Sequence, residues 1–144
     1  VVVDPAGRPC GCGRRGCLEQ YASATGLVLT YRELDPESDE DVTSQQIAEH
    51  AFSGEKRALV AFENTAETLG LALANSVAYT QPEAIFLFGG LAAAGELLVK
   101  PLRKHFEANL LNVFRGKTDI RLTGLSENSA AILGAASLIW AKHR

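Results

Sequence analysis

Three cysteines define the chemistry that this sequence can support. They are the only cysteines among the 144 residues, and all of them lie in one glycine-rich stretch, at Cys10, Cys12 and Cys17. Thiolates this close in sequence can bind one metal ion if the backbone turns back sharply between them, and glycines such as Gly13 and Gly16 permit such turns because they adopt positive φ without strain. The spacing therefore predicts a metal site, with zinc as the metal that best fits three thiolates.

A tetrahedral zinc site needs a fourth ligand. The histidines of the chain are His50, His105 and His143, and each lies far from the cysteines in a segment with helical periodicity. The ordinary interpretation of such residues is an exposed or capping histidine, so the fourth ligand can lie outside this chain. Two alternatives to a metal stay open, namely a disulfide that leaves one thiol over and three unpaired thiols.

The residues around the cysteines resemble the signature of the ROK family of sugar kinases and repressors, which includes bacterial glucokinases. The matching residues are Cys10-x-Cys12-Gly-x-x-Gly-Cys17-x-Glu19 and, before them, Val3-Asp4-Pro5-x-Gly7. The resemblance implies a structural zinc on the three cysteines, completed by a histidine that would lie just before Val1. It also implies that Glu19 binds sugar hydroxyls. By position alone, Glu19 is equally well interpreted as an acidic residue in a first helical turn, where the helix dipole favours negative charge.

The periodicity of the remaining chain predicts an α/β fold. One helix is expected from Leu18 onward, and a second short helix, capped by Ser23 or Thr25, is expected to run through Leu34. Further helices are expected from Thr43 to Gly54 with a Thr43–Gln46 capping box, from Glu55 to Tyr79, and from Glu96 to Phe114. A last helix is expected from Ser129 to Lys142, with Ser126 or Asn128 as its cap. Pro101 either kinks the helix expected from Glu96 to Phe114 or marks the true start of that helix. The apolar run Ala84–Phe88 predicts a strand buried on both faces, and Asp119–Thr123 predicts an edge or half-buried strand.

Several apolar residues are expected to form the packing faces of these helices. They are Ile47, Ala51 and Phe52 in one helix, Leu59, Phe62, Ala66, Leu69, Leu73 and Val77 in the longest helix, and the small residues Ala130, Ala131, Gly134, Ala135 and Ala136 in the last. Gly70 and Ala74 leave room for a close neighbour. The run Val1–Val3 predicts a strand that begins before this sequence.

Gly89 and Gly90 directly follow the first of the two strands. A residue without a side chain at the carboxyl end of a strand lets the backbone lie close to a ligand, although tight strand-to-helix turns use the same pair. The run Phe88-Gly89-Gly90-Leu91 is similar to the adenosine motif of the sugar kinase, heat-shock and actin superfamily, which the ROK family shares. The resemblance implies that Gly89 and Gly90 line a nucleotide pocket.

The fold implied by the resemblance is the second lobe of an actin-like ATPase, with ribonuclease H-like topology and an inserted zinc-binding loop. On that basis, residues 1–19 form the zinc and sugar loop, 20–82 a helical segment, and 83–144 a strand-helix-strand-helix segment on the nucleotide side. Val1 is not a translation start and the chain contains no methionine, so a longer protein is expected. The lobe that precedes Val1 would complete the sheet.

The reaction implied by the resemblance is transfer of the γ-phosphoryl group of ATP, with Mg²⁺, to a hexose hydroxyl, most simply the 6-hydroxyl of glucose. The phosphate loop and the catalytic aspartate of the family belong upstream of Val1, so this part of the protein is expected to be inactive alone. Asp4, beside Pro5, is interpreted as a turn residue and not as the catalytic base.

Composition and charge restrict the remaining classes of function. A net charge of −3 gives no general attraction to nucleic acid or to anionic membranes. The absence of a long apolar run and of a signal-peptide pattern predicts a soluble protein, and reduced thiols favour the cytoplasm. A nucleic-acid partner is expected only in the repressor branch of the family, and a zinc-stabilised interaction domain is the third alternative. The resemblance also implies a homo-oligomer, either a dimer or a tetramer.

Overall fold

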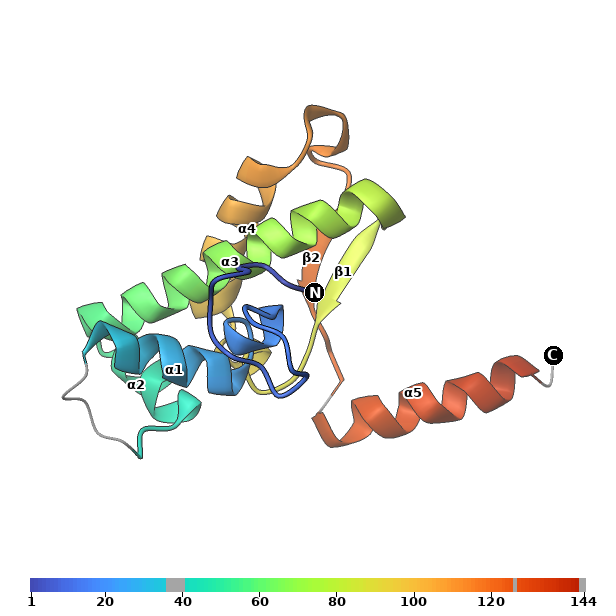
Figure 1. The fold of residues 1–144 in the computed structure, drawn as a ribbon. Helices are drawn as coiled ribbons and strands as arrows, with labels where there is room; N and C mark the ends of the chain where they lie inside the picture. Colours follow the sequence, from blue (N-terminus) through green and yellow to red (C-terminus); the bar gives the residue numbers. More distant parts are fainter. Residues whose placement is uncertain (36–40, 126, 143–144) are drawn as a thin grey trace.

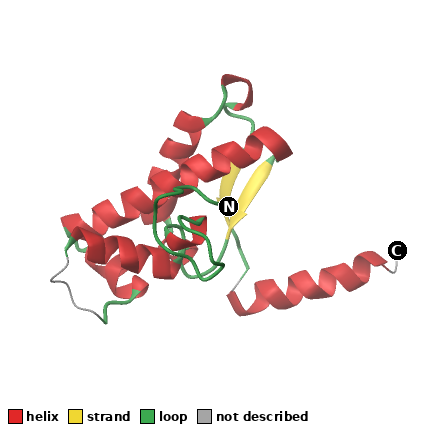
Figure 2. Cartoon of the chain, viewed as in Figure 1, coloured by secondary structure: helices red, strands yellow, loops and turns green. Residues whose placement is uncertain are grey.

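The computed structural model describes residues 1–35, 41–125 and 127–142 (Figure 1). Residues 1–17 are drawn as a loop that folds over the front of the molecule (Figure 2). The elements that follow are η1 (Leu18–Gln20), α1 (Ala24–Leu34), α2 (Ser44–Phe52), α3 (Lys56–Thr80), β1 (Ala84–Leu87), η2 (Ala92–Ala94), α4 (Glu96–Asn109), η3 (Asn112–Phe114), β2 (Asp119–Leu122) and α5 (Glu127–Lys142), where η denotes a short 3-10 helix.

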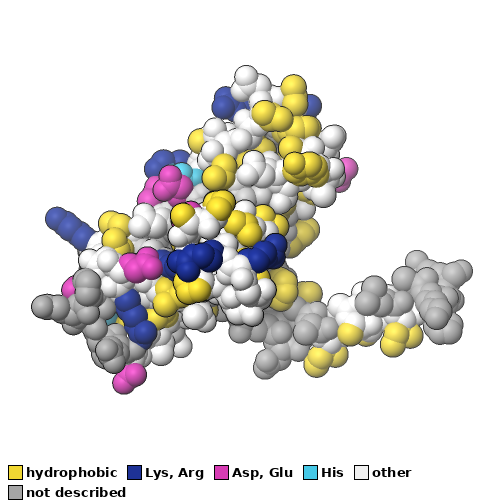
Figure 3. Space-filling view, in the orientation of Figure 1, with side chains coloured by type: hydrophobic (Ala, Val, Ile, Leu, Met, Phe, Trp, Pro, Cys, Tyr) yellow, Lys and Arg dark blue, Asp and Glu magenta, His cyan; other side chains and the backbone are white. Residues whose placement is uncertain are grey.

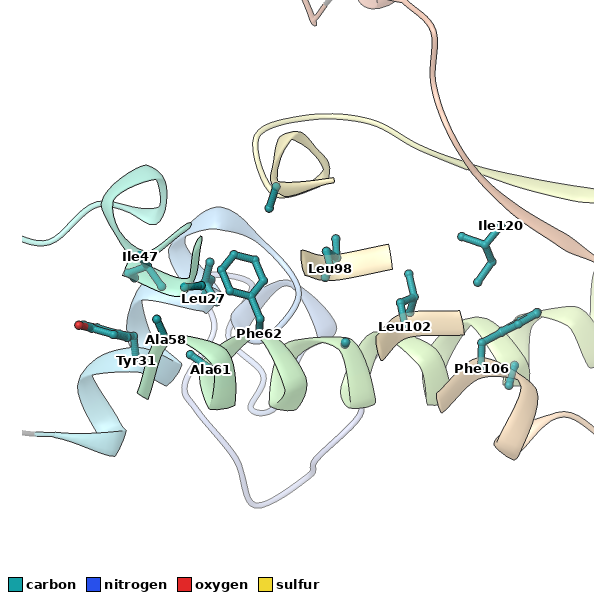
Figure 4. Close-up of a cluster of buried hydrophobic side chains, with 14 of the residues drawn as sticks. Leu27, Tyr31, Ile47, Ala58, Ala61, Phe62, Leu98, Leu102, Phe106 and Ile120 are labelled. Carbon is teal, nitrogen blue, oxygen red and sulfur yellow. The ribbon is translucent and has the colours of Figure 1, made fainter. Parts of the chain in front are cut away.

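The long helix α3 is the centre of the packing. α4 runs alongside it, and α1 and α2 pack around its N-terminal half (Figure 1). The buried side chains follow α3 from Tyr31 at one end to Ile120 at the other (Figure 4). The largest of them are Tyr31, Phe62, Phe106, Leu27, Ile47, Leu98 and Leu102. This continuous core fixes the position of every element that leads into the sites described below.

Small residues on α3 determine how closely α4 approaches. Ala66 and Gly70 are buried, and a Cβ atom added at Gly70 would lie 2.9 Å from both the Cβ of His105 and the backbone nitrogen of Phe106. The prediction that Gly70 leaves room for a neighbour is therefore confirmed. The face of α3 that packs on the core also includes Ala58 and Ala61, which are buried. Leu59 points outward and is 41% exposed, so the prediction that Leu59 belongs to the apolar stripe is wrong.

The predicted helix caps are observed, whereas some of the predicted helix ends are not. The Ser23 hydroxyl accepts a hydrogen bond from the backbone N–H of Gly26 at 3.0 Å, and Thr43 forms the predicted capping box with Gln46. The expected helix from Leu18 is only the short η1. In the same way α4 begins at Glu96, continues through Pro101 and ends at Asn109, because the backbone becomes extended at Leu110.

β1 and β2 form a parallel pair in which Ile85 lies opposite Ile120. Ile85 packs against the core and Ile120 is buried, whereas Phe86, whose side chain points to the other face, is 61% exposed. The prediction that this strand is buried on both faces is therefore wrong, because α3 and α4 cover one face and no described element covers the other. Val2 pairs with Cys17 in an isolated bridge, so the run Val1–Val3 is not a regular strand here.

The last helix, α5, projects away from the other elements (Figure 1). The described large apolar side chains of α5 face solvent, including Ile132 at 71% exposed and Trp140 at 83%, and Figure 3 shows hydrophobic atoms at separate places along this helix. Gly134, Ala135 and Ala136 are exposed as well, so the packing expected of these three members of the small-residue face is not seen, whereas the side chains of Ala130 and Ala131 lie outside the described residues. Ser126, one of the two predicted caps, lies outside the described residues. In the described part of the chain, no helix combines the length and the apolar character needed to cross a membrane.

The close contact between α3 and α4 generates a prediction for the full-length protein. Gly70→Ala should lower the free energy of unfolding by about 1–3 kcal/mol, because the new methyl group overlaps the α4 backbone. Asn75→Ala, at an exposed position of the same helix, should change it by less than about 0.5 kcal/mol. Urea denaturation of both variants measures the difference, and equal stability would contradict the packing described here.

Candidate metal centre and ligand sites

The loop before η1 is held closed by its own backbone. Pro9 and Arg15 form an antiparallel bridge, and the N–H of Gly16 donates to the carbonyl oxygen of Arg8 at 2.7 Å. Gly16 is buried with φ at +64°, and a Cβ atom built on it would lie 1.4 Å from the carbonyl oxygen of Asp4. Only glycine satisfies both conditions, so Gly16 is the residue that allows the chain to return on itself.

This return brings the three thiols together. The Sγ atoms of Cys10, Cys12 and Cys17 all lie within 4.8 Å of one another, and those of Cys12 and Cys17 are 3.5 Å apart. A zinc ion with Zn–S bonds of about 2.3 Å holds its sulfurs roughly 3.8 Å apart, so the three side chains fit the donor set of such an ion. All three cysteines are free thiols in this structure.

The electrostatics of the cluster favour a thiolate. Hydrogen bonds from the side chain and backbone of Arg14 lower the pKa of Cys12 to about 6, whereas the hydrogen bond with Cys12, together with burial, raises the pKa of Cys17 to about 11. Below about pH 6 Cys12 carries a proton, and above it Cys12 is a thiolate, which is the form that binds metal. Of Cys12 and Cys17, the exposed Cys12 is thus the first to lose its proton as the pH rises.

The histidines considered as a fourth ligand are engaged elsewhere. His50 lies 3.1 Å from a carboxylate oxygen of Glu55, and the Nε2 of His105 lies 2.8 Å from Glu63. His143 falls outside the described residues. Within the described ranges, the cysteine triplet is therefore a three-ligand group.

Glu19 lies next to the metal loop in space as well as in sequence. It is the middle residue of η1, the turn that starts directly after Cys17, and its carbonyl oxygen accepts a hydrogen bond from the Ser23 hydroxyl at 2.7 Å. Its side chain is exposed. The sequence predicts a first helical turn at this point, and the structure places Glu19 in a 3-10 turn instead, with its carboxylate open to a ligand.

The two predicted nucleotide residues line two different hollows at the carboxyl end of β1. Gly89, with φ at +93°, borders a hollow of about 360 Å³ together with Phe88 and Leu125. Gly90 borders a larger hollow of about 480 Å³ together with Phe52. A Cβ atom added at either glycine would meet nothing within 4 Å, so both present bare backbone to open space. Glu19 lines neither hollow.

The larger hollow contains residues that the sequence did not indicate. α2 contributes Ser44, Gln45, Glu49 and Phe52, although this helix was expected only to pack on the core. Phe52 was predicted to belong to the apolar face with Ile47 and is instead 71% exposed at the hollow. No signal in the sequence distinguishes an apolar residue that faces the core from one that faces a cavity.

Sequence comparison with known proteins identifies the family to which this chain belongs. A sequence profile of the ROK family matches residues 1–142. The chain is 34% identical to a glucokinase from Halalkalibacterium halodurans, over 96% of this chain and 45% of that protein. The chain therefore belongs to the ROK family, as its cysteine pattern predicted, and it spans about half the length of the curated relatives it matches.

Solved structures show the same relationship. The chain superposes with a TM-score of 0.85 on a ROK family glucokinase from Streptomyces griseus, which was crystallised with glucose and AMPPNP; the sequences are 31% identical over 96% of this chain and 49% of that one. It also superposes, with a TM-score of 0.76 and 21% identity over 90% of this chain and 34% of that one, on a ROK family transcriptional regulator homologous to the Escherichia coli MLC protein. The second likeness shows a shared fold only.

The metal centre can be tested by analysing the metal content of the full-length protein. Cys12→Ala should reduce its zinc content to a small fraction of the wild-type value at micromolar zinc, because one of the thiolate donors is lost. Gly11→Ala is the matched control, since its Cβ would meet nothing within 4 Å and its φ is not positive. Equal zinc content in wild type and Cys12→Ala would refute a metal site at these cysteines.

Proposed function

We propose that the full-length protein transfers the γ-phosphoryl group of ATP to a hexose, at the 6-hydroxyl of glucose or of a close relative. The 34%-identical relative is a glucokinase, and the structural neighbour from Streptomyces griseus was crystallised with glucose and AMPPNP. On this proposal, the chain supplies the metal loop, the sugar-binding Glu19 and the nucleotide contacts of Gly89 and Gly90. The catalytic aspartate belongs to the part of the protein before Val1.

The observation that carries this proposal is the continuity between the cysteine cluster and Glu19. Cys17 is buried, contributes a sulfur to the cluster and directly precedes η1. A zinc ion bound by Cys10, Cys12 and Cys17 would cross-link the loop and so hold that turn in place, and a site closed by a fourth protein ligand leaves no position for an activated water. On this proposal the fourth ligand is a histidine that precedes Val1, and the zinc would have a structural role.

Glu19 suits the recognition of a sugar. An ionised carboxylate accepts several hydrogen bonds, so one side chain can bind two neighbouring hydroxyl groups of a hexose. Phosphoryl transfer depends mainly on the positioning of both substrates and on charge stabilisation, which ATP-bound Mg²⁺ provides in such enzymes. By orienting the hexose, Glu19 would present the accepting hydroxyl to the γ-phosphate.

The larger hollow suits the adenosine part of ATP. Phe52 offers an exposed apolar ring, Gln45 and Glu49 offer polar groups, and Gly90 offers bare backbone. Planar bases are bound in proteins by this combination of aromatic faces and a few polar atoms. The smaller hollow, which Gly89 borders, lies at the carboxyl ends of β1 and β2 beside Leu87 and Leu122, and such strand ends are where open α/β sheets bind their ligands.

Two other functions remain as alternatives. A sugar-responsive repressor is the other branch of the family that the cysteine signature resembles, and it would bind DNA through a module outside this chain. A zinc-stabilised interaction domain would show no change in melting temperature with glucose. The division into residues 1–19, 20–82 and 83–144, the homo-oligomer and the cytoplasmic location stay predictions.

The role of Glu19 can be tested by substitution in the full-length protein. Glu19→Gln should raise the KM or Kd for glucose roughly 10- to 100-fold, because hydrogen bonds to a charged group contribute about 1.5–3 kcal/mol. The KM for ATP and the zinc content should stay as in wild type. Glu67→Gln, an exposed glutamate on α3, is the control and should leave all three values unchanged. A Glu19→Gln enzyme with wild-type affinity for glucose would overturn the assignment of this residue.

A further inference from the structure

Arg8 has an environment that its position in an N-terminal loop does not suggest. It lies two residues before Cys10, yet its side chain is only 11% exposed. Its guanidinium carbon lies 4.6 Å from the centre of the Tyr21 ring, which is within range of a cation–π interaction. A charged side chain is rarely buried this far unless its hydrogen-bond donors are satisfied.

The guanidinium of Arg8 forms hydrogen bonds with two separate elements. One terminal nitrogen donates to the carbonyl oxygen of Gln20 in η1 and to that of Gly26 at 3.3 Å. The other donates to the hydroxyl of Thr30 at 2.9 Å, and Nε donates to the carboxylate of Glu33 at 2.8 Å. The side chain therefore joins η1 to α1.

The backbone of Arg8 belongs to the metal loop. Its carbonyl oxygen accepts the hydrogen bond from Gly16, and its own N–H donates to the hydroxyl of Tyr21 at 3.0 Å. One residue thus contacts the loop that brings the cysteines together, the turn that carries Glu19, and the helix behind that turn. The carbonyl of Gln20 belongs to the residue immediately after Glu19, so this hydrogen bond holds the backbone of the turn from which the Glu19 side chain projects.

We propose that Arg8 is a positioning residue for Glu19, through which the geometry of the metal loop sets the affinity for the sugar. This inference rests on the sugar-binding role proposed above for Glu19. Arg8 does not contact the sugar; it holds the η1 turn at the orientation in which Glu19 can bind. Lysine cannot replace it, because an ammonium group is a point charge without the planar fork that reaches the Gln20 carbonyl, Thr30 and Glu33 together.

Arg57 provides a matched control. Its guanidinium carbon lies 4.0 Å from the centre of the Tyr31 ring, and it forms ion pairs with Glu55 and Asp35. It is thus a second arginine that stacks on a tyrosine of the same lobe, but its hydrogen bonds go to Glu55, Asp35 and Tyr31, so it joins α1 to the start of α3 and not to η1. A purely stabilising role would give Arg8 and Arg57 the same phenotype.

The test compares four variants of the full-length protein with wild type: Arg8→Lys, Arg57→Lys, Glu19→Gln and the double variant Arg8→Lys/Glu19→Gln. For each, the affinity for glucose, the zinc content and the stability to urea denaturation are measured. Arg8→Lys should weaken glucose binding about 5- to 20-fold with zinc content unchanged, and Arg57→Lys should lower stability while glucose binding stays within about two-fold of wild type. The double variant should bind glucose within about two-fold of Glu19→Gln alone, because residues that act through one group are not additive.

Three outcomes would overturn the proposal. They are wild-type glucose affinity in Arg8→Lys, multiplied effects in the double variant, and loss of zinc in Arg8→Lys, which would place its action at the metal and not at Glu19. If Glu19→Gln itself binds glucose normally, the proposed function fails, and this result is distinguishable from the others. Should Arg8→Lys fold poorly, Glu33→Gln removes a single partner of Arg8 and should weaken glucose binding in the same direction by a smaller factor.

Discussion

The close approach of Gly16 to Asp4 is the constraint on which the candidate site depends. With its Cβ position 1.4 Å from a carbonyl oxygen and a positive φ, Gly16 lets the loop fold back so that three sulfurs come within 4.8 Å of one another. The same fold-back brings Arg8 against Tyr21 and places Cys17 directly before η1. A bound metal would make this arrangement rigid, so sulfur convergence and the placement of Glu19 are consequences of one backbone geometry.

The remaining elements supply a rigid base for that loop. α3 passes behind both η1 and α1, and its small residues hold α4 close enough for β1 and β2 to pack on the same core. The two ligand regions therefore belong to one continuous packing unit, although they lie at different places on it. The exposed face of the sheet, with Phe86, and the apolar side chains of α5 are surfaces that we expect the remainder of a full-length protein to cover, since this chain spans 49% of the structural relative from Streptomyces griseus.

Local features of this chain were predictable from its sequence because local chemistry decides them. Family membership follows from the cysteine and glycine spacing, and the Thr43 and Ser23 caps follow from side chains that bond their own helix. The failures at Leu59, Phe52 and Phe86 have a different origin, because periodicity identifies an apolar residue without showing whether a partner covers it. The role of Arg8 could not be predicted either, since its partners are distributed from Gln20 to Glu33 and are assembled only by the fold.

The central claim is that a metal held by the three cysteines fixes the turn that points Glu19 at a sugar. The most direct measurement is a crystal structure of the full-length protein with glucose, with anomalous diffraction data collected at the zinc absorption edge. Our account predicts an anomalous peak about 2.3 Å from the sulfurs of Cys10, Cys12 and Cys17, and the Glu19 carboxylate within hydrogen-bond distance of glucose hydroxyls. Sulfurs that point apart in zinc-replete crystals, or a Glu19 carboxylate directed away from the sugar, would contradict it.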